Sequence, residues 1–75
     1  MARTTAEKIQ DHTAAGDSVT LINSLVGQSS LTTEDTATLQ RNVDHLEIMI
    51  AKTDWDSGQS TTAFATAVAA GKAKL

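Results

Sequence analysis

The strongest pattern of hydrophobic and polar positions lies in the middle of the chain. Four apolar residues follow one another there at intervals of four, three and four, namely Leu39, Val43, Leu46 and Ile50. This spacing places them along one side of an α-helix. Thr32 is a typical N-cap residue, and the acidic Glu34 and Asp35 suit the positive end of a helix dipole. The pattern predicts a helix over about residues 33–52, the longest of the chain.

A weaker apolar pattern precedes this helix, in the segment 18–26. Its apolar residues recur at helical spacing, at Val19, Ile22, Leu25 and Val26. The segment also contains β-prone residues, so a strand is the alternative structure. Strict alternation fails at Leu21 and Ile22, and no partner strand is evident in the sequence. We therefore favour a helix for this segment.

The start of the chain predicts a further helix through a capping box. Thr4 is placed to cap the backbone, and Glu7 to reach back to it. The apolar content that follows is thin, and Gly16 is a suitable residue to end a helix. Two interpretations stay open. Either this helix covers about residues 5–15 and ends at Gly16, or Gly16 is only a kink in one long helix over 5–26.

The C-terminal part predicts a last helix over about residues 61–70, with Ser60 as its cap. Apolar residues and one glycine again follow helical spacing there, at Phe64, Ala67, Val68 and Gly71. Alanine and threonine surround them, so this helix is slim and able to lie close against a neighbour. The elements together predict an all-α fold, a small bundle of three to four helices in one domain, 1–75. Residues 1–16 and 72–75 are candidates for extended or mobile arms.

The predicted helix over 33–52 is apolar around most of its circumference near its end. Ile48 projects away from the apolar stripe, and such a two-sided helix is normally covered on both sides. Trp55 follows Ile48 by seven residues, and tryptophan is enriched at binding hot spots. We therefore predict that six residues contact another chain: Ile48, Met49, Ile50, Trp55, Phe64 and Val68. The alternative is that the terminal helices cover this surface and that Trp55 tucks back onto its own core.

Composition strengthens the expectation of a partner chain. The sequence has 75 residues, of which 40% are hydrophobic, but twelve of these are alanine, and only one tryptophan and one phenylalanine occur. Domains of this size bury a smaller share of their unfolded surface than larger domains do, about 60%, and are marginally stable alone. Cysteine is absent, so disulfides cannot help. Association with another chain is the remaining common source of stability.

Charge and hydropathy exclude several function classes. The net charge is −3, and the six lysine and arginine residues form no basic block, so binding to nucleic acid is disfavoured. The N-terminus lacks the apolar segment of a secretory signal, and no apolar run is long enough to span a membrane. We expect a protein that is not secreted, has no membrane partner, and is cytoplasmic unless it belongs to a particle.

The residues that commonly carry chemistry are sparse. No cysteine nucleophile exists, and a nucleophilic serine would need His12 or His45 as its base. Asp44 and Glu47 flank His45, but side chains at these spacings point to different sides of a helix and cannot ligate one metal ion. No metalloprotease, calcium-loop or phosphate-loop motif occurs. We therefore expect a protein that is not an enzyme and has no small-molecule substrate, cofactor or metal.

One segment carries a family resemblance. Residues 41–47 contain Arg-Asn-Val followed, after one residue, by His-Leu-Glu, and an alanine-rich stretch near the end includes Ala69–Lys72. In these features the chain resembles short proteins encoded among the structural genes of tailed bacteriophages. The resemblance implies a virion component, a capsid accessory, neck or tail piece in many copies, whose partners are other copies of itself or larger virion proteins. The alternative is a small helical homodimeric regulatory module that binds a host or phage protein.

Overall fold

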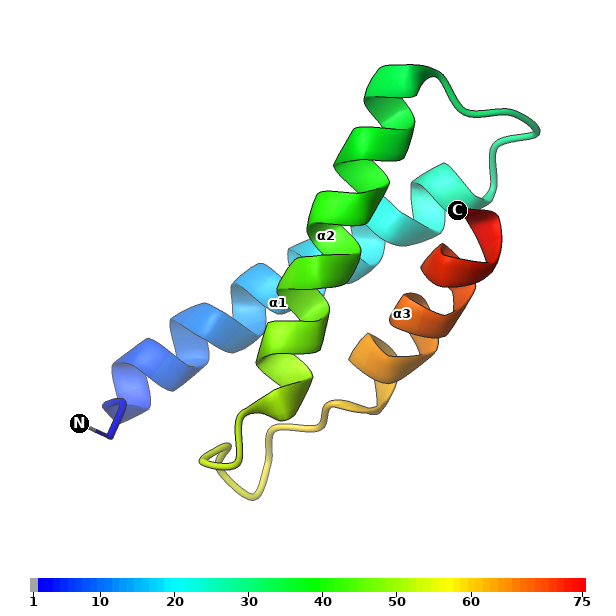
Figure 1. The fold of residues 1–75 in the computed structure, drawn as a ribbon. Helices are drawn as coiled ribbons and strands as arrows, with labels where there is room; N and C mark the ends of the chain where they lie inside the picture. The colour runs from blue at the N-terminus through cyan, green and yellow to red at the C-terminus, as the bar shows by residue number, and fades with distance from the viewer. Residues whose placement is uncertain (1) are drawn as a thin grey trace.

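Three helices build the part of the chain that the computed structural model describes, residues 2–75 (Figure 1). They are α1 (Thr5–Val26), α2 (Thr33–Ala51) and α3 (Thr62–Lys74). Each helix packs against the other two, and the described residues contain no strand. The predicted all-α bundle is therefore confirmed, with three helices.

Helix α1 is one continuous helix of 22 residues. It begins with the predicted capping box, in which the Glu7 backbone N–H donates to Thr4 Oγ1 at 3.1 Å and the Thr4 backbone N–H donates to Glu7 Oε1 at 2.9 Å. The helix continues through Gly16, so a first helix that ends there is wrong, and the segment 18–26 is helical. Ala15, next to Gly16, is fully buried in the bundle. This packing outweighs the weak helix preference of one glycine.

Helix α2 matches its prediction at the start and ends one residue earlier, at Ala51. Thr32 is its N-cap, and the Thr32 hydroxyl accepts a hydrogen bond from the Asp35 backbone N–H at 3.0 Å. The predicted stripe faces the core: its first three residues are fully buried and Ile50 is half-buried. With 19 residues, α2 is shorter than α1, so the expectation that it is the longest helix is wrong. The reason is that α1 does not stop at Gly16.

Helix α3 begins at Thr62 and continues to Lys74, past the predicted end near residue 70. The Ser60 hydroxyl accepts a hydrogen bond from the Thr62 backbone N–H at 3.2 Å and so helps to cap the helix from outside it. Gly71 lies inside the helix and is buried. A Cβ atom at Gly71 would lie 2.6 Å from Val43 Cγ2, so the missing side chain is what allows α3 to lie this close to α2.

The core lies between the three helices and contains ten buried apolar residues: Ala15, Ile22, Leu25, Leu39, Val43, Leu46, Met49, Phe64, Ala67 and Val68. Throughout residues 2–75, each buried side-chain nitrogen or oxygen has a hydrogen-bond partner. Lys74 Nζ donates to the Gln28 carbonyl at 2.6 Å and ties the end of α3 to the α1–α2 loop. The arm-like behaviour expected of residues 1–16 and 72–75 stays a prediction, and residue 1 lies outside the described residues.

Candidate functional site

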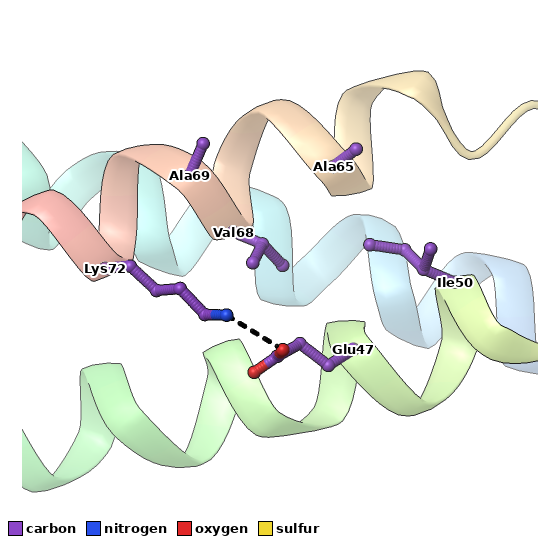
Figure 2. A pocket seen from close by; sticks show the side chains of 6 residues that line it. All are labelled: Glu47, Ile50, Ala65, Val68, Ala69 and Lys72. Atoms are coloured by element: carbon purple, nitrogen blue, oxygen red, sulfur yellow. Dashed lines mark hydrogen bonds and ion pairs between the residues drawn. The ribbon is translucent and has the colours of Figure 1, made fainter.

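A groove between α2 and α3 is the candidate site (Figure 2). It has a volume of about 350 Å³ and is lined by Glu47, Ile50, Ala65, Val68, Ala69 and Lys72. The side chains of Val68 and Ile50 reach into the space between the helices, and α3 also contributes the methyl groups of Ala65 and Ala69 and the side chain of Lys72. The groove is therefore mostly apolar along its length.

The alanines of α3 explain why a groove exists at this place. Ala65 and Ala69 are four residues apart and so lie on one side of the helix, one turn from each other. In Figure 2 their short methyl groups point away from α2, so they leave the seam between the two helices open on this side. Figure 2 shows both methyl groups beside Val68 along α3. The alanine and threonine content predicts a slim helix, and on this side of α3 the small side chains leave an open groove beside α2.

One ion pair crosses the end of the groove. Lys72 Nζ on α3 lies 3.0 Å from Glu47 Oε2 on α2, and the two side chains retain 56% and 45% of their exposure (Figure 2). Exposed pairs of this kind contribute about 0–1 kcal/mol, because water screens the charges and both long side chains lose freedom. The pair marks the polar edge of the groove but is too weak to hold it closed against a partner.

The six residues predicted to contact a partner are not gathered at one surface. Ile50 and Val68 both line the groove. Met49 and Phe64 are buried in the core of the chain, as is most of Val68, so their apolar character is explained without a partner. Ile48 is 59% exposed and points away from the groove, since it is two residues before Ile50 on the helix. Exposed single apolar residues of this kind are common on protein surfaces.

Trp55 lies in a different cluster, at the end of the bundle. Its indole N–H donates at 3.0 Å to the Met49 carbonyl at the end of α2, which also accepts a hydrogen bond from the Lys52 backbone N–H at 3.3 Å. The ring contacts His12 and Phe64 edge-on, with centroids 5.5 and 6.4 Å away. Trp55 is therefore half-buried against its own core, which is the alternative given above for this residue.

A serine and a histidine come together between α1 and α2. Ser18 Oγ lies 2.8 Å from His45 Nδ1, which is the spacing of a nucleophile and its base. Ser18 is only 6% exposed, however, and the groove is on the other side of α2. The contact satisfies a buried hydroxyl and links the two helices. It joins residues 27 positions apart, so no local sequence pattern could predict it.

Ion pairs hold the N-terminal end of the bundle to the connector between α2 and α3. Arg3 pairs with Asp11 and Asp54, and Lys8 Nζ lies 2.6 Å from Asp56 Oδ1. The hydrogen bond from Arg3 holds the pKa of Asp54 below its ordinary value of 3.8. Near the same end, the hydrogen bond from the Thr4 backbone holds the pKa of Glu7 below its ordinary value of 4.5. Folding thus favours the charged form of both carboxyl groups.

Acid is expected to loosen this end of the bundle first. Because both pKa values are lowered on folding, the stabilisation is complete above pH 4.5 and is lost as the pH falls through 4.5 and 3.8 and below. Fluorescence of the single tryptophan and far-ultraviolet circular dichroism, followed from pH 7 to pH 2.5, check this. We expect the tryptophan signal to change before helix content falls. Simultaneous loss of both signals would contradict a local opening.

The described residues were also considered as a metal site and as a membrane span, and the chain was compared with known proteins. No group of three or more His, Cys, Asp or Glu residues among residues 2–75 could hold a metal ion. In the same part of the chain, no helix has the length and apolar character needed to cross a membrane. Comparisons with known protein families, with curated proteins and with solved structures found no match to this chain.

Proposed function

We propose that this chain is a non-enzymatic interaction subunit of a larger assembly, and that the groove between α2 and α3 receives an apolar segment of a neighbouring protein. The observation that carries the proposal is the open apolar lining formed by Ile50, Ala65, Val68 and Ala69. Removal of such apolar surface from water is favourable by about 25 cal/mol per Å². An amphipathic helix laid into a groove between two helices is a recurring way to gain this free energy.

We further propose that the assembly is a virion and that the chain occupies it in many copies, as a capsid accessory, neck or tail piece. The support is the resemblance of the segment 41–47 to phage structural proteins. A core of ten residues, three of them no larger than valine in α2 and α3, also suits a subunit that gains stability from its neighbours. Mass spectrometry of purified particles tests this, because a structural subunit is present in many copies and a regulatory dimer is absent or substoichiometric.

The substitution Ala69→Glu is expected to block the groove without disturbing the fold. Ala69 is exposed and lies on α3, so a glutamate there reaches into water and changes stability by about 0.5 kcal/mol or less. The same side chain places a charge against the apolar lining, where a partner would have to bury it. We expect the number of copies per purified particle to fall at least ~10-fold, which corresponds to about 1.4 kcal/mol of binding free energy.

Ala63→Glu is the matched control, because Ala63 is an exposed alanine of α3 that does not line the groove. This variant is expected to enter particles like the wild-type chain. Circular dichroism and thermal unfolding of both variants confirm that the fold is kept. Equal incorporation of the two variants would contradict the assignment of the groove as the contact surface, and absence of the wild-type chain from particles would contradict the virion proposal.

A further inference from the structure

Arg3 is the most enclosed charged side chain at the N-terminal end, with 14% of its side-chain surface exposed. The guanidinium carbon lies 4.4 Å from the centroid of the Trp55 ring, which is within the range of a cation–π contact. One edge of the guanidinium donates to both oxygens of Asp54, from Nε at 3.1 Å and from Nη2. Nη1 donates to Asp11 Oδ2 at 2.5 Å. Arg3 therefore fills a socket made of one aromatic face and two carboxylates.

The walls of this socket are held by contacts that do not involve Arg3. Trp55 is fixed by the hydrogen bond to the Met49 carbonyl and by the edges of His12 and Phe64. The connector that carries Asp54 is fastened to α1 at three further points. Lys8 Nζ pairs with Asp56, the Gln59 side-chain amide donates to the Lys8 carbonyl at 3.2 Å, and His12 Nε2 donates to the Ser60 carbonyl at 2.8 Å. The socket should therefore persist when Arg3 is absent.

The geometry is selective for a guanidinium group. Two N–H donors facing the two oxygens of one carboxylate, with the guanidinium carbon over an aromatic ring, match arginine and cannot be reproduced by the single ammonium of lysine. The hydrogen bonds to Asp54 and Asp11 also raise the pKa of the Arg3 guanidinium above its ordinary value. The carboxylates keep 40% and 35% of their side-chain exposure, so the socket can be reached from water.

Arg3 can leave this socket without unfolding a helix. Residues 2–4 precede α1 and are not helical, so withdrawal of the side chain needs only rotation of this short segment. Because Arg3 belongs to the same chain, its effective concentration at the socket is high. It therefore weakens the binding of an arginine from another molecule without abolishing it. The arrangement has the form of a site covered by a piece of its own chain.

We propose that Asp11, Asp54 and Trp55 form a recognition site for an arginine side chain of a partner protein, and that Arg3 occupies this site as an intramolecular competitor. The site lies on the N-terminal end of α1 and on the connector, whereas the groove lies between α2 and α3. The proposal is therefore independent of the function proposed for the groove. Release of Arg3, by competition from a partner arginine, exposes the site.

The test uses the Arg3→Ala variant of the full chain and N-acetyl-arginine amide as the probe. Fluorescence of the single tryptophan and the NMR signal of its indole N–H report binding at the socket. We expect saturable binding by Arg3→Ala in the millimolar range, and at least ~10-fold weaker binding by the wild-type chain because Arg3 competes. N-acetyl-lysine amide should bind Arg3→Ala at least ~10-fold more weakly than the arginine probe.

Three further variants make the test decisive. Arg41→Ala removes an arginine that donates to Thr38 in its own helix and takes no part in the socket, and it should behave like the wild-type chain. The double variant Arg3→Ala with Asp54→Asn should lose binding. If Arg3→Ala folds poorly, Arg3→Lys takes its place in the test. It keeps a positive charge at position 3 but cannot form the paired hydrogen bonds of arginine, so it should still bind the arginine probe. Absence of saturable binding in both Arg3 variants, equal binding of the two probes, or binding that survives Asp54→Asn would overturn the proposal.

Discussion

Replacement of Phe64 by alanine is expected to lower the free energy of unfolding of the isolated chain by about 3–5 kcal/mol. Phe64 is only 3% exposed and is the single phenylalanine of the chain. Its ring lies 4.9 Å from the His12 ring, centroid to centroid, and also contacts Trp55. The substitution thus opens a cavity where α1, α3 and the connector meet. A chain of 75 residues commonly has roughly 4–11 kcal/mol in total, so the substitution removes a large share of the stability and unfolds the variant if the total is near the lower end of this range.

Urea unfolding followed by circular dichroism measures this loss, and Ile48→Ala is the control. Ile48 is 59% exposed, so its truncation should change the free energy of unfolding by about 0.5 kcal/mol or less. The comparison separates a large apolar residue that packs in the core, Phe64, from one that is exposed on the surface, Ile48, although the two look alike in the sequence. A Phe64→Ala protein as stable as the wild-type chain would mean that Phe64 is not packed in the core of the isolated chain.

Helix α2 shows what could be predicted from the sequence, because its determinants are local. The N-cap Thr32 and the acidic residue three positions later act within one turn. The stripe from Leu39 to Ile50 has one periodicity, and its first three residues are buried in the core while Ile50 is half-buried. Each of these signals depends on residues close together in the chain, so the helix and its buried side follow from the order of the amino acids.

The surroundings of Met49 and Trp55 could not be predicted in the same way. The apolar character of residues 46–51 indicates that something covers them, but not whether the cover is another chain or this one. Here the cover is partly internal. The rings of Phe64, His12 and Trp55 meet at the end of the bundle, although 52 positions separate His12 and Phe64. The bonds between Arg3 and Asp54 span 51 positions.

The groove was missed for a different reason. Its walls on α3 are Ala65 and Ala69, and small residues give only a weak signal in a hydrophobic pattern. Their four-residue spacing was the one usable sign. The lining residues Glu47 and Lys72 are ordinary surface charges in the sequence, and only the packing of α2 against α3 places them on one edge. Glycine was misleading in a similar way, since Gly16 suits a helix end but lies inside α1.

The substitution Gly71→Ala is expected to destabilise the chain although it improves helix propensity. The new methyl carbon would lie 2.6 Å from Val43 Cγ2 and 3.4 Å from both Ile22 Cγ2 and Leu39 Cδ1. All three neighbours are fully buried, and the β-branched side chain of Val43 has little rotational freedom. Overpacking of this kind costs about 1–3 kcal/mol, and the gain from replacing glycine by alanine in a helix is about 1 kcal/mol or less. The net result is a loss of up to about 2 kcal/mol.

Gly16→Ala is the matched substitution in α1, and its effect should have the opposite sign. No atom outside its own helix backbone lies within 4 Å of the position that the new methyl carbon would take. Only the helix propensity and the smaller entropy of the unfolded chain then change, which stabilises the protein by about 0.5–1 kcal/mol. In a domain of this size 1 kcal/mol shifts the Tm by about 4–8 °C, so thermal unfolding should move the two variants in opposite directions from the wild-type chain. Two variants that shift together would mean that α3 does not approach Val43 as closely as Gly71 allows.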